Sequence, residues 1–284
     1  MSQLEVIAEG LAFPEGPVVM ADGSVIVVEI MGRRVTRCWG DLRKETVSEP
    51  GGGPNGAAIG PDGALYVCNS GGMGHDGSPK EAGRIERIDL ATGKVERLYD
   101  SCDGTPLGAP NDLMFDADGN IWFTDLGDTG PDCKFYGGLY CARSDGSAIT
   151  RIYGRAISYN GVGISPDMQT VYVSDTYTAR VYAYDRKVEA QLPRWLATAP
   201  GPVMLDSLAM TAAGNVCVAT LMPGAITTVT PEGQTSQVSL EDRLVTNIAF
   251  GGADMMDAWI TFSQAGTLVK TRWAEPGMKL VYNG

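Results

Sequence analysis

Six side chains of this sequence could act together on a divalent cation. They recur at intervals of 40, 56, 49, 46 and 41 residues, and they are Glu15, Asn55, Asn111, Asn160, Asp206 and Asn247. We call these six residues the anchors. All of them carry hard oxygen donors, which calcium and magnesium prefer, and two carboxylates can neutralise a divalent charge while amide oxygens complete the shell. Their composition therefore indicates a metal site.

The two acidic anchors argue for function more strongly than the amides do. Asn and Asp also favour loop-to-strand corners, where they bond their own backbone, so Asn55 and Asn247 are open to a structural or a functional interpretation. Glu is a poor turn former, yet Glu15 stands in the segment FPEGP at 13–17. Carboxylates crowded near one axis repel unless a cation pairs them. We therefore expect Glu15 and Asp206 to be functional.

Each anchor begins a copy of the same sequence repeat. The repeat contains an apolar pair, an acidic or Gly-rich turn and a run of β-branched and aromatic residues. The third copy, APNDLMFDADGNIWFTD at 109–125, has the signals of a β-hairpin, and a second hairpin follows each copy, as at 83–89. A period of this length is typical of a four-stranded propeller blade. The sequence predicts an all-β fold, a six-bladed β-propeller with four antiparallel strands per blade.

The copies fill the chain, so we expect residues 1–284 to form one domain. Two short apolar runs, at 5–7 and 279–282, are left over. We expect these N- and C-terminal strands to pair in the last blade and close the propeller, which leaves no open edge. By pseudo-symmetry, all six anchors then lie at the same end of the central channel.

Composition restricts the partners. A net charge of −12 disfavours nucleic acid, because phosphate contacts supply most non-specific affinity. There is no apolar run long enough for a membrane, and the N-terminus lacks the pattern of a signal peptide, so we expect a cytoplasmic protein, monomeric or homodimeric. The six cysteines lack CxxC spacing and are interpreted as free thiols, with Cys102 and Cys133 the pair that could meet.

Four motifs resemble those of a known family, which contains senescence marker protein (regucalcin), gluconolactonase and the luciferin-regenerating enzyme. They are PEGP at 14–17, PND at 110–112, SYNG at 158–161 and LDSL at 205–208. The resemblance implies a six-bladed propeller with one divalent metal in its channel, bound here by Glu15, Asn160 and Asp206. It makes Asn111 a fourth ligand or a substrate contact. Ala109 stands where some members have Arg, which puts a sugar-acid substrate in doubt.

Residue chemistry and resemblance together predict a metal-dependent hydrolase that opens a lactone, with Asp206 as general base. Calcium is the expected cation, although oxygen ligands also admit Mg²⁺, Mn²⁺, Zn²⁺ or Fe²⁺. A Ser-His-Asp triad is excluded, because His75 is the single histidine and no GxSxG serine exists. Asn111, Asn55, His75 and Asp125 are the expected substrate contacts. His75, in a loop insertion that could form a lid, is also consistent with a solvated loop residue.

Three alternatives remain open from sequence. Related propellers hydrolyse organophosphate esters with a similar ligand set, and loop shape would decide between the two bonds. A non-catalytic propeller that binds a ligand on one face is a second alternative, which the acidic anchors oppose. A metal-free lyase of the strictosidine-synthase type would need a catalytic Glu in a late blade, where this chain has Asp206 and Asn247.

Overall fold

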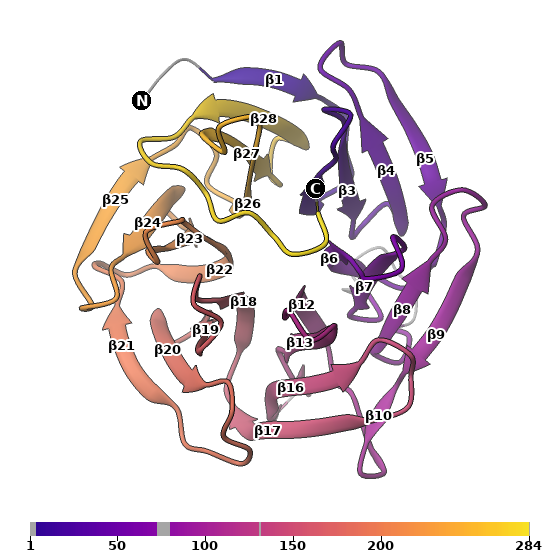
Figure 1. The fold of residues 1–284 in the computed structure, drawn as a ribbon, viewed down its shortest axis with the longest axis vertical. Coiled ribbons are helices and arrows are strands. Elements are labelled where there is room, and N and C mark those ends of the chain that lie inside the picture. Colours follow the sequence, from indigo (N-terminus) through magenta and orange to yellow (C-terminus); the bar gives the residue numbers. More distant parts are fainter. Residues whose placement is uncertain (1–3, 73–79, 131, 284) are drawn as a thin grey trace.

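Six antiparallel sheets of four strands surround a central axis, as the ribbon in Figure 1 shows. The structure is a computed structural model and describes residues 4–72, 80–130 and 132–283. Within these ranges all regular elements are strands, and there is no helix long and apolar enough to cross a bilayer. The predicted six-bladed propeller is therefore confirmed.

The first five blades each use four strands in chain order, from the axis outward. Blade 1 contains β2 (Pro14–Val19), β3 (Val25–Glu29), β4 (Arg34–Cys38) and β5 (Lys44–Ser48). Blade 2 contains β6 (Pro54–Ile59), β7 (Leu65–Asn69), β8 (Arg84–Ile88) and β9 (Val95–Tyr99). Blade 3 contains β12 (Pro110–Phe115), β13 (Asn120–Asp125), β16 (Gly137–Arg143) and β17 (Ile149–Ala156).

The remaining strands repeat this plan. Blade 4 contains β18 (Tyr159–Ile164), β19 (Thr170–Asp175), β20 (Arg180–Asp185) and β21 (Arg194–Thr198). Blade 5 contains β22 (Met204–Met210), β23 (Val216–Leu221), β24 (Ala225–Val229) and β25 (Thr235–Ser239). Two short hairpins extend the loops around blade 3: β10 (Ser101–Cys102) with β11 (Thr105–Pro106), and β14 (Asp128–Thr129) with β15 (Lys134–Phe135).

Blade 6 closes the ring with strands from both parts of the chain. It contains β26 (Val245–Gly251), β27 (Asp257–Phe262), β28 (Thr267–Arg272) and, outermost, β1 (Glu5–Ala8). The register pairs Glu5 with Lys270. The expected closure by terminal strands is right, but the expected partner is wrong, because residues 279–282 form no strand.

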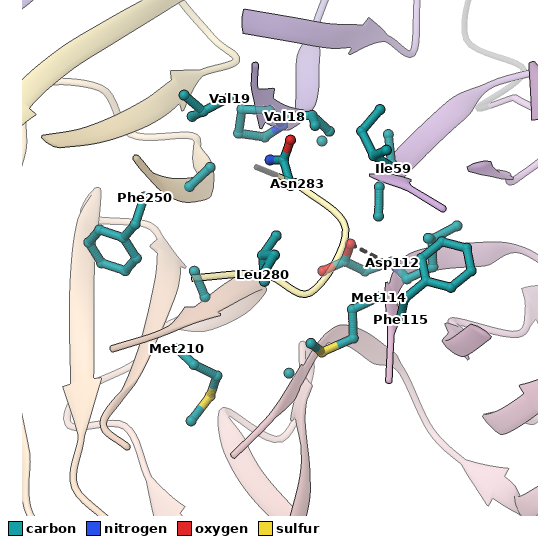
Figure 2. Close-up of a pocket in the computed structure, with 18 of the residues that line it drawn as sticks. Val18, Val19, Ile59, Asp112, Met114, Phe115, Met210, Phe250, Leu280 and Asn283 are labelled. Carbon is teal, nitrogen blue, oxygen red and sulfur yellow. Dashed lines mark hydrogen bonds between the residues drawn. The ribbon is translucent and has the colours of Figure 1, made fainter. Parts of the chain in front are cut away.

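The segment after β28 instead covers one end of the channel. We call Met278 to Asn283 the tail; it lies against the last residues of the innermost strands (Figure 2). The Met278 amide donates to the Met210 carbonyl at 2.9 Å, and the Tyr282 ring meets Phe115 edge-on, with centroids 5.8 Å apart. The apolar side chains that suggested a strand thus line one end of the channel.

Hydrophobic packing between neighbouring blades holds the ring together. Trp122, Tyr172 and Trp259 are buried in such clusters, and Trp122 packs with strands of blades 3 and 4. These aromatic side chains therefore have a structural role in packing. All six cysteines are free.

Candidate functional site

The six anchors lie in the innermost strands, at the channel end opposite the tail. All are buried, with exposed fractions between 2% for Glu15 and 9% for Asp206. Each stands in the first residues of its strand, in β2, β6, β12, β18, β22 and β26 in turn. Pseudo-symmetry therefore repeats one backbone position six times around one end of the channel, as the spacing predicts.

The same backbone irregularity accompanies every anchor. The pairing register of the innermost strand with its neighbour shifts between Glu15 and Val18 in blade 1, and a corresponding shift occurs beside the anchor in each other blade. A bulge breaks the alternation of side chains and turns one of them in a new direction. The strand can then present a polar residue toward the channel although the rest of it packs in apolar surroundings.

Three of the anchors are followed by glycine, and contact between blades explains this. A Cβ on Gly16 would lie 2.5 Å from the Asn55 carbonyl oxygen, and one on Gly56 would lie 2.5 Å from the Asp112 Cα. A Cβ on Gly161 would lie 2.7 Å from the Leu208 nitrogen. Blade 3 has Asp112 at this position, so a carboxylate occupies a place where these three blades have no side chain.

Hydroxyl groups of the second strands fix the backbone at the anchors of the next blade. Thr124 of β13 donates to the Asn160 carbonyl, and Ser174 of β19 donates to the Asp206 carbonyl at 2.6 Å. At the ring closure Ser263 donates to the Pro14 carbonyl at 2.6 Å. The anchors are therefore positioned across blade boundaries, which was not predicted from the sequence. The signal for the first two bonds is a Thr or Ser at the same place in WFTD and YVSD.

Glu15 is the most deeply buried of the acidic anchors. The Asn247 side-chain amide and the Gly16 backbone amide each donate to its Oε2 at 3.0 Å. Burial nevertheless raises the pKa of Glu15 to about 7, because these hydrogen bonds only partly offset desolvation. Asn247 thus acts here as a holder of Glu15.

Two aspartates share this environment. Burial, followed by repulsion from Glu15, raises the pKa of Asp112 to about 7. Burial also raises the pKa of Asp206 well above its ordinary value, and both Glu15 and Asp112 add to the shift. No Lys or Arg among the described residues forms an ion pair with these three carboxyl groups. Three acids therefore face one another without a cationic partner.

The amide anchors complete the arrangement. The Asn160 Nδ2 donates to Thr176 Oγ1 at 3.1 Å, which leaves its Oδ1 with one long bond, from Ser207 Oγ at 3.4 Å. Asn111 Oδ1 is buried and has no hydrogen-bond partner. An unpaired buried acceptor is costly, and coordination to a cation would remove that cost. Both amide oxygens are therefore available as ligands.

The predicted ligand set fits an oxygen-binding cation on these observations. Glu15 and Asp206 supply uncompensated negative charge, and the orphaned Asn111 oxygen supplies an acceptor that needs a partner. Among the described residues no group of three or more His, Cys, Asp or Glu side chains is placed to hold a metal ion. The predicted ligands include only two carboxylates, so a bound cation would also need the amide oxygens of Asn111 and Asn160 as ligands.

The remaining predicted contacts differ in what surrounds them. Asp125 is buried, and its carboxylate accepts from the amides of Gly108, Ala109 and Gly127 at 2.7 to 2.8 Å, so it fixes the loop that leads into Asn111. Asn55 is buried at its anchor position. His75 lies outside the described residues. The roles of these residues in substrate binding stay predictions.

Beneath the anchors a channel cavity of about 100 Å³ extends to the tail. Asp112 and Asn247 line it near the anchors, while the rest of its wall is largely apolar, with Met114, Phe115 and Leu280 among the side chains drawn in Figure 2. Asp112 was not among the predicted site residues. The signal that could have found it is the acid in PND, at the place occupied by glycine in three other copies.

Comparison with known proteins bears on this site. Residues 13–264 match the family described as the SMP-30/Gluconolactonase/LRE-like region. The gluconolactonase of Zymomonas mobilis is 27% identical over 207 residues, which cover 64% of this chain and 55% of that protein. The lactonohydrolase oryL of Aspergillus oryzae is 26% identical over 251 residues, which cover 76% and 56%. The chain thus spans just over half the length of these curated relatives.

A solved structure shows the same fold. A gluconolactonase of Xanthomonas campestris superposes with a TM-score of 0.80 at 24% sequence identity, over 95% of this chain and 89% of that one. At this identity the likeness establishes the propeller architecture.

Proposed function

The chain belongs to the SMP-30/gluconolactonase/LRE-like family, and we propose that it is a divalent-metal-dependent lactonase. The observation that carries the proposal is the group of three buried carboxyls, Glu15, Asp112 and Asp206: burial raises the pKa of each, Glu15 adds to the shifts of the two aspartates, and no Lys or Arg of the described residues pairs with them. The names of the relatives support lactone hydrolysis as the reaction class. Glu15, Asn111, Asn160 and Asp206 would hold the metal, with calcium as the expected ion.

When bound, a divalent cation would compensate the buried negative charge and would polarise the carbonyl group of the substrate. Asp206 is the proposed general base, which accepts a proton from the water that attacks the lactone carbonyl. Burial and repulsion from Glu15 raise the pKa of Asp206 in the absence of a metal, and a cation bound beside it would lower that pKa again. Ser174 holds the Asp206 backbone, and Asn247 orients Glu15, so both acids are fixed before substrate arrives.

The test is a metal-dependence assay. The purified protein is stripped with a chelator and assayed on five- and six-membered lactones, while calcium, magnesium, manganese and zinc are returned one at a time. We expect hydrolysis to return with metal in the native protein and in Asp167→Asn, which changes an exposed turn residue at the far end of blade 4. Asp206→Asn should stay inactive. Hydrolysis that persists at full rate in the chelator would refute the metal requirement.

A further inference from the structure

A second hollow lies away from the channel, between the loops of blades 2 and 3. It is a cleft of about 690 Å³. Its wall comes from segments 80–83, 105–108 and 135–136 together with Asp125, Asp128, Tyr140, Arg151 and Gly154. Gly108 in this wall precedes Asn111 by three residues, so the cleft begins beside the third anchor along the chain. We call it the side cleft.

The acids of the side cleft are already satisfied. Asp125 is occupied by three backbone amides. Asp128 pairs with Lys80 at 2.7 Å, and Glu81 pairs with Arg33 and Arg84. Asp128 and Glu81 are therefore paired with cationic side chains, and Asp125 is held by backbone amides.

Arg151 is the exception among the charged residues of this wall. Its Nη2 donates to the Cys102 carbonyl at 3.1 Å, its Nε is buried with no partner, and no carboxylate of the described residues pairs with it. Gly154 makes room for it, since a Cβ there would lie 2.6 Å from the Arg151 Cδ. A guanidinium held in this way is suited to a carboxylate ligand.

Aromatic rings form the other part of the wall. Phe135 and Tyr136 are 60% and 63% exposed, although large apolar side chains of this kind gain by being covered. The buried Tyr140 ring stacks on Phe123 and lies 5.8 Å from the Arg151 guanidinium carbon. The cleft therefore offers two exposed aromatic rings and a guanidinium group with which no carboxylate of the described residues forms an ion pair.

We propose that the side cleft is a binding site for small aromatic carboxylates, with Arg151 receiving the carboxylate and the rings of Phe135 and Tyr136 covering the planar part. This site is separate from the anchors. No anchor residue lines it, although Asp125, a predicted substrate contact, does, and the binding test below requires no lactonase activity.

The probe is benzoate, titrated at low salt by calorimetry or NMR with EDTA present, so that no cation at the anchors can recruit it. Benzamide is the neutral control ligand of nearly the same shape. We expect benzoate to bind at least about tenfold more tightly than benzamide, because a charge-assisted hydrogen bond is much stronger than a neutral one. Arg151→Gln should reduce benzoate affinity to that of benzamide.

Arg155→Gln is the matched variant, since it removes the same charge from an exposed position on the same strand, β17, and should leave benzoate binding unchanged. If Arg151→Gln does not fold, Gly154→Ala displaces the arginine while keeping its charge and should weaken benzoate by a similar factor. Equal affinity for benzoate and benzamide, an equal loss in both arginine variants, or no benzoate binding up to about 10 mM would each overturn the proposal.

Discussion

Two aspartates of the innermost strand of blade 3 and its turn, four residues apart, show what distinguishes the functional end of the channel. Asp112 and Asp116 are both buried. Burial raises the pKa of Asp112 to about 7, and the neighbouring Glu15 adds to this. Burial acts on Asp116 too, but hydrogen bonds from Asn120 and Trp122 outweigh it and lower its pKa.

The difference lies in the number of donors. Asp116 accepts from the Trp122 indole at 3.0 Å, from Asn120 and from Arg186 at 2.9 Å, whereas Asp112 receives two backbone amides, one of them at 3.4 Å. The structural acid Asp116 is surrounded by hydrogen-bond donors, whereas the acids near the anchors have too few donors to compensate their charge. Burial alone therefore does not indicate a site; burial without compensation does.

The largest expected effect is on catalysis. Asp206→Asn removes the proposed base and should lower kcat/KM for a lactone substrate by about a thousandfold, within the range of general base catalysis. The measurement is initial-rate hydrolysis with saturating calcium, with circular dichroism to verify the fold. A reduction below about tenfold would assign the base to another group, with Asp112 the first to test.

The second prediction contrasts the two aspartates in stability. Asp116→Asn breaks a buried ion pair with Arg186 and should lower the free energy of unfolding by about 3 kcal/mol. Asp112→Asn removes an uncompensated charge and should not lower stability at about pH 8 in a chelator. Urea denaturation measures both. If the two variants lose equal stability, the distinction between paired and unpaired acids is wrong.

Third, calcium should stabilise the protein. An ion present at about 100 times its dissociation constant adds about 2.7 kcal/mol to the free energy of unfolding if it binds only the folded state. Thermal or urea unfolding with calcium, and again with excess EDTA, measures this. Glu15→Gln should remove most of the gain, while Asp167→Asn, far from the anchors, should keep it.

Fourth, stability without metal should fall as pH rises. Glu15 and Asp112 have folded pKa values of about 7, above their ordinary 4.5 and 3.8, so between these values the folded state holds protons that the unfolded state has released. Their contribution to stability therefore decreases from about pH 4.5 to pH 7. Calcium should flatten this slope, because it stabilises the ionised carboxylates. A slope of the same size with and without calcium would separate these acids from the metal site.

The smallest effect concerns the opposite end of the channel. Tyr282→Ala removes an edge-on aromatic contact with Phe115 and should cost about 1 kcal/mol of stability while leaving kcat/KM unchanged. Urea denaturation and the lactone assay check the two halves of this prediction. A large loss of activity would show that the tail and the anchors are coupled.

Much of this architecture was predictable because its signals are local. The hairpin turns and strand patterns recur with each anchor, so blade number and the position of the anchors follow from the repeat. The closing strands were expected from two short apolar runs, at 5–7 and 279–282. A local sequence pattern does not distinguish a strand from a segment that packs over a channel. Residues 279–282 were therefore misassigned, whereas Thr267–Arg272 is the true partner.

Asp112 and the inter-blade hydroxyls of Thr124 and Ser174 were missed for a different reason. Their roles depend on contacts between blades, which a single copy of the repeat does not display. Comparison of the copies position by position would have marked Asp112, since three other copies have glycine there.

The tail makes the two ends of the channel different. A propeller channel is in principle open at both ends, but Met278 to Asn283 pass across one end of this one. If the covered end admits no small molecule, substrate enters and product leaves on the anchor side, and the two exclude each other. We then expect product to inhibit competitively, and shortening the tail should open a second route.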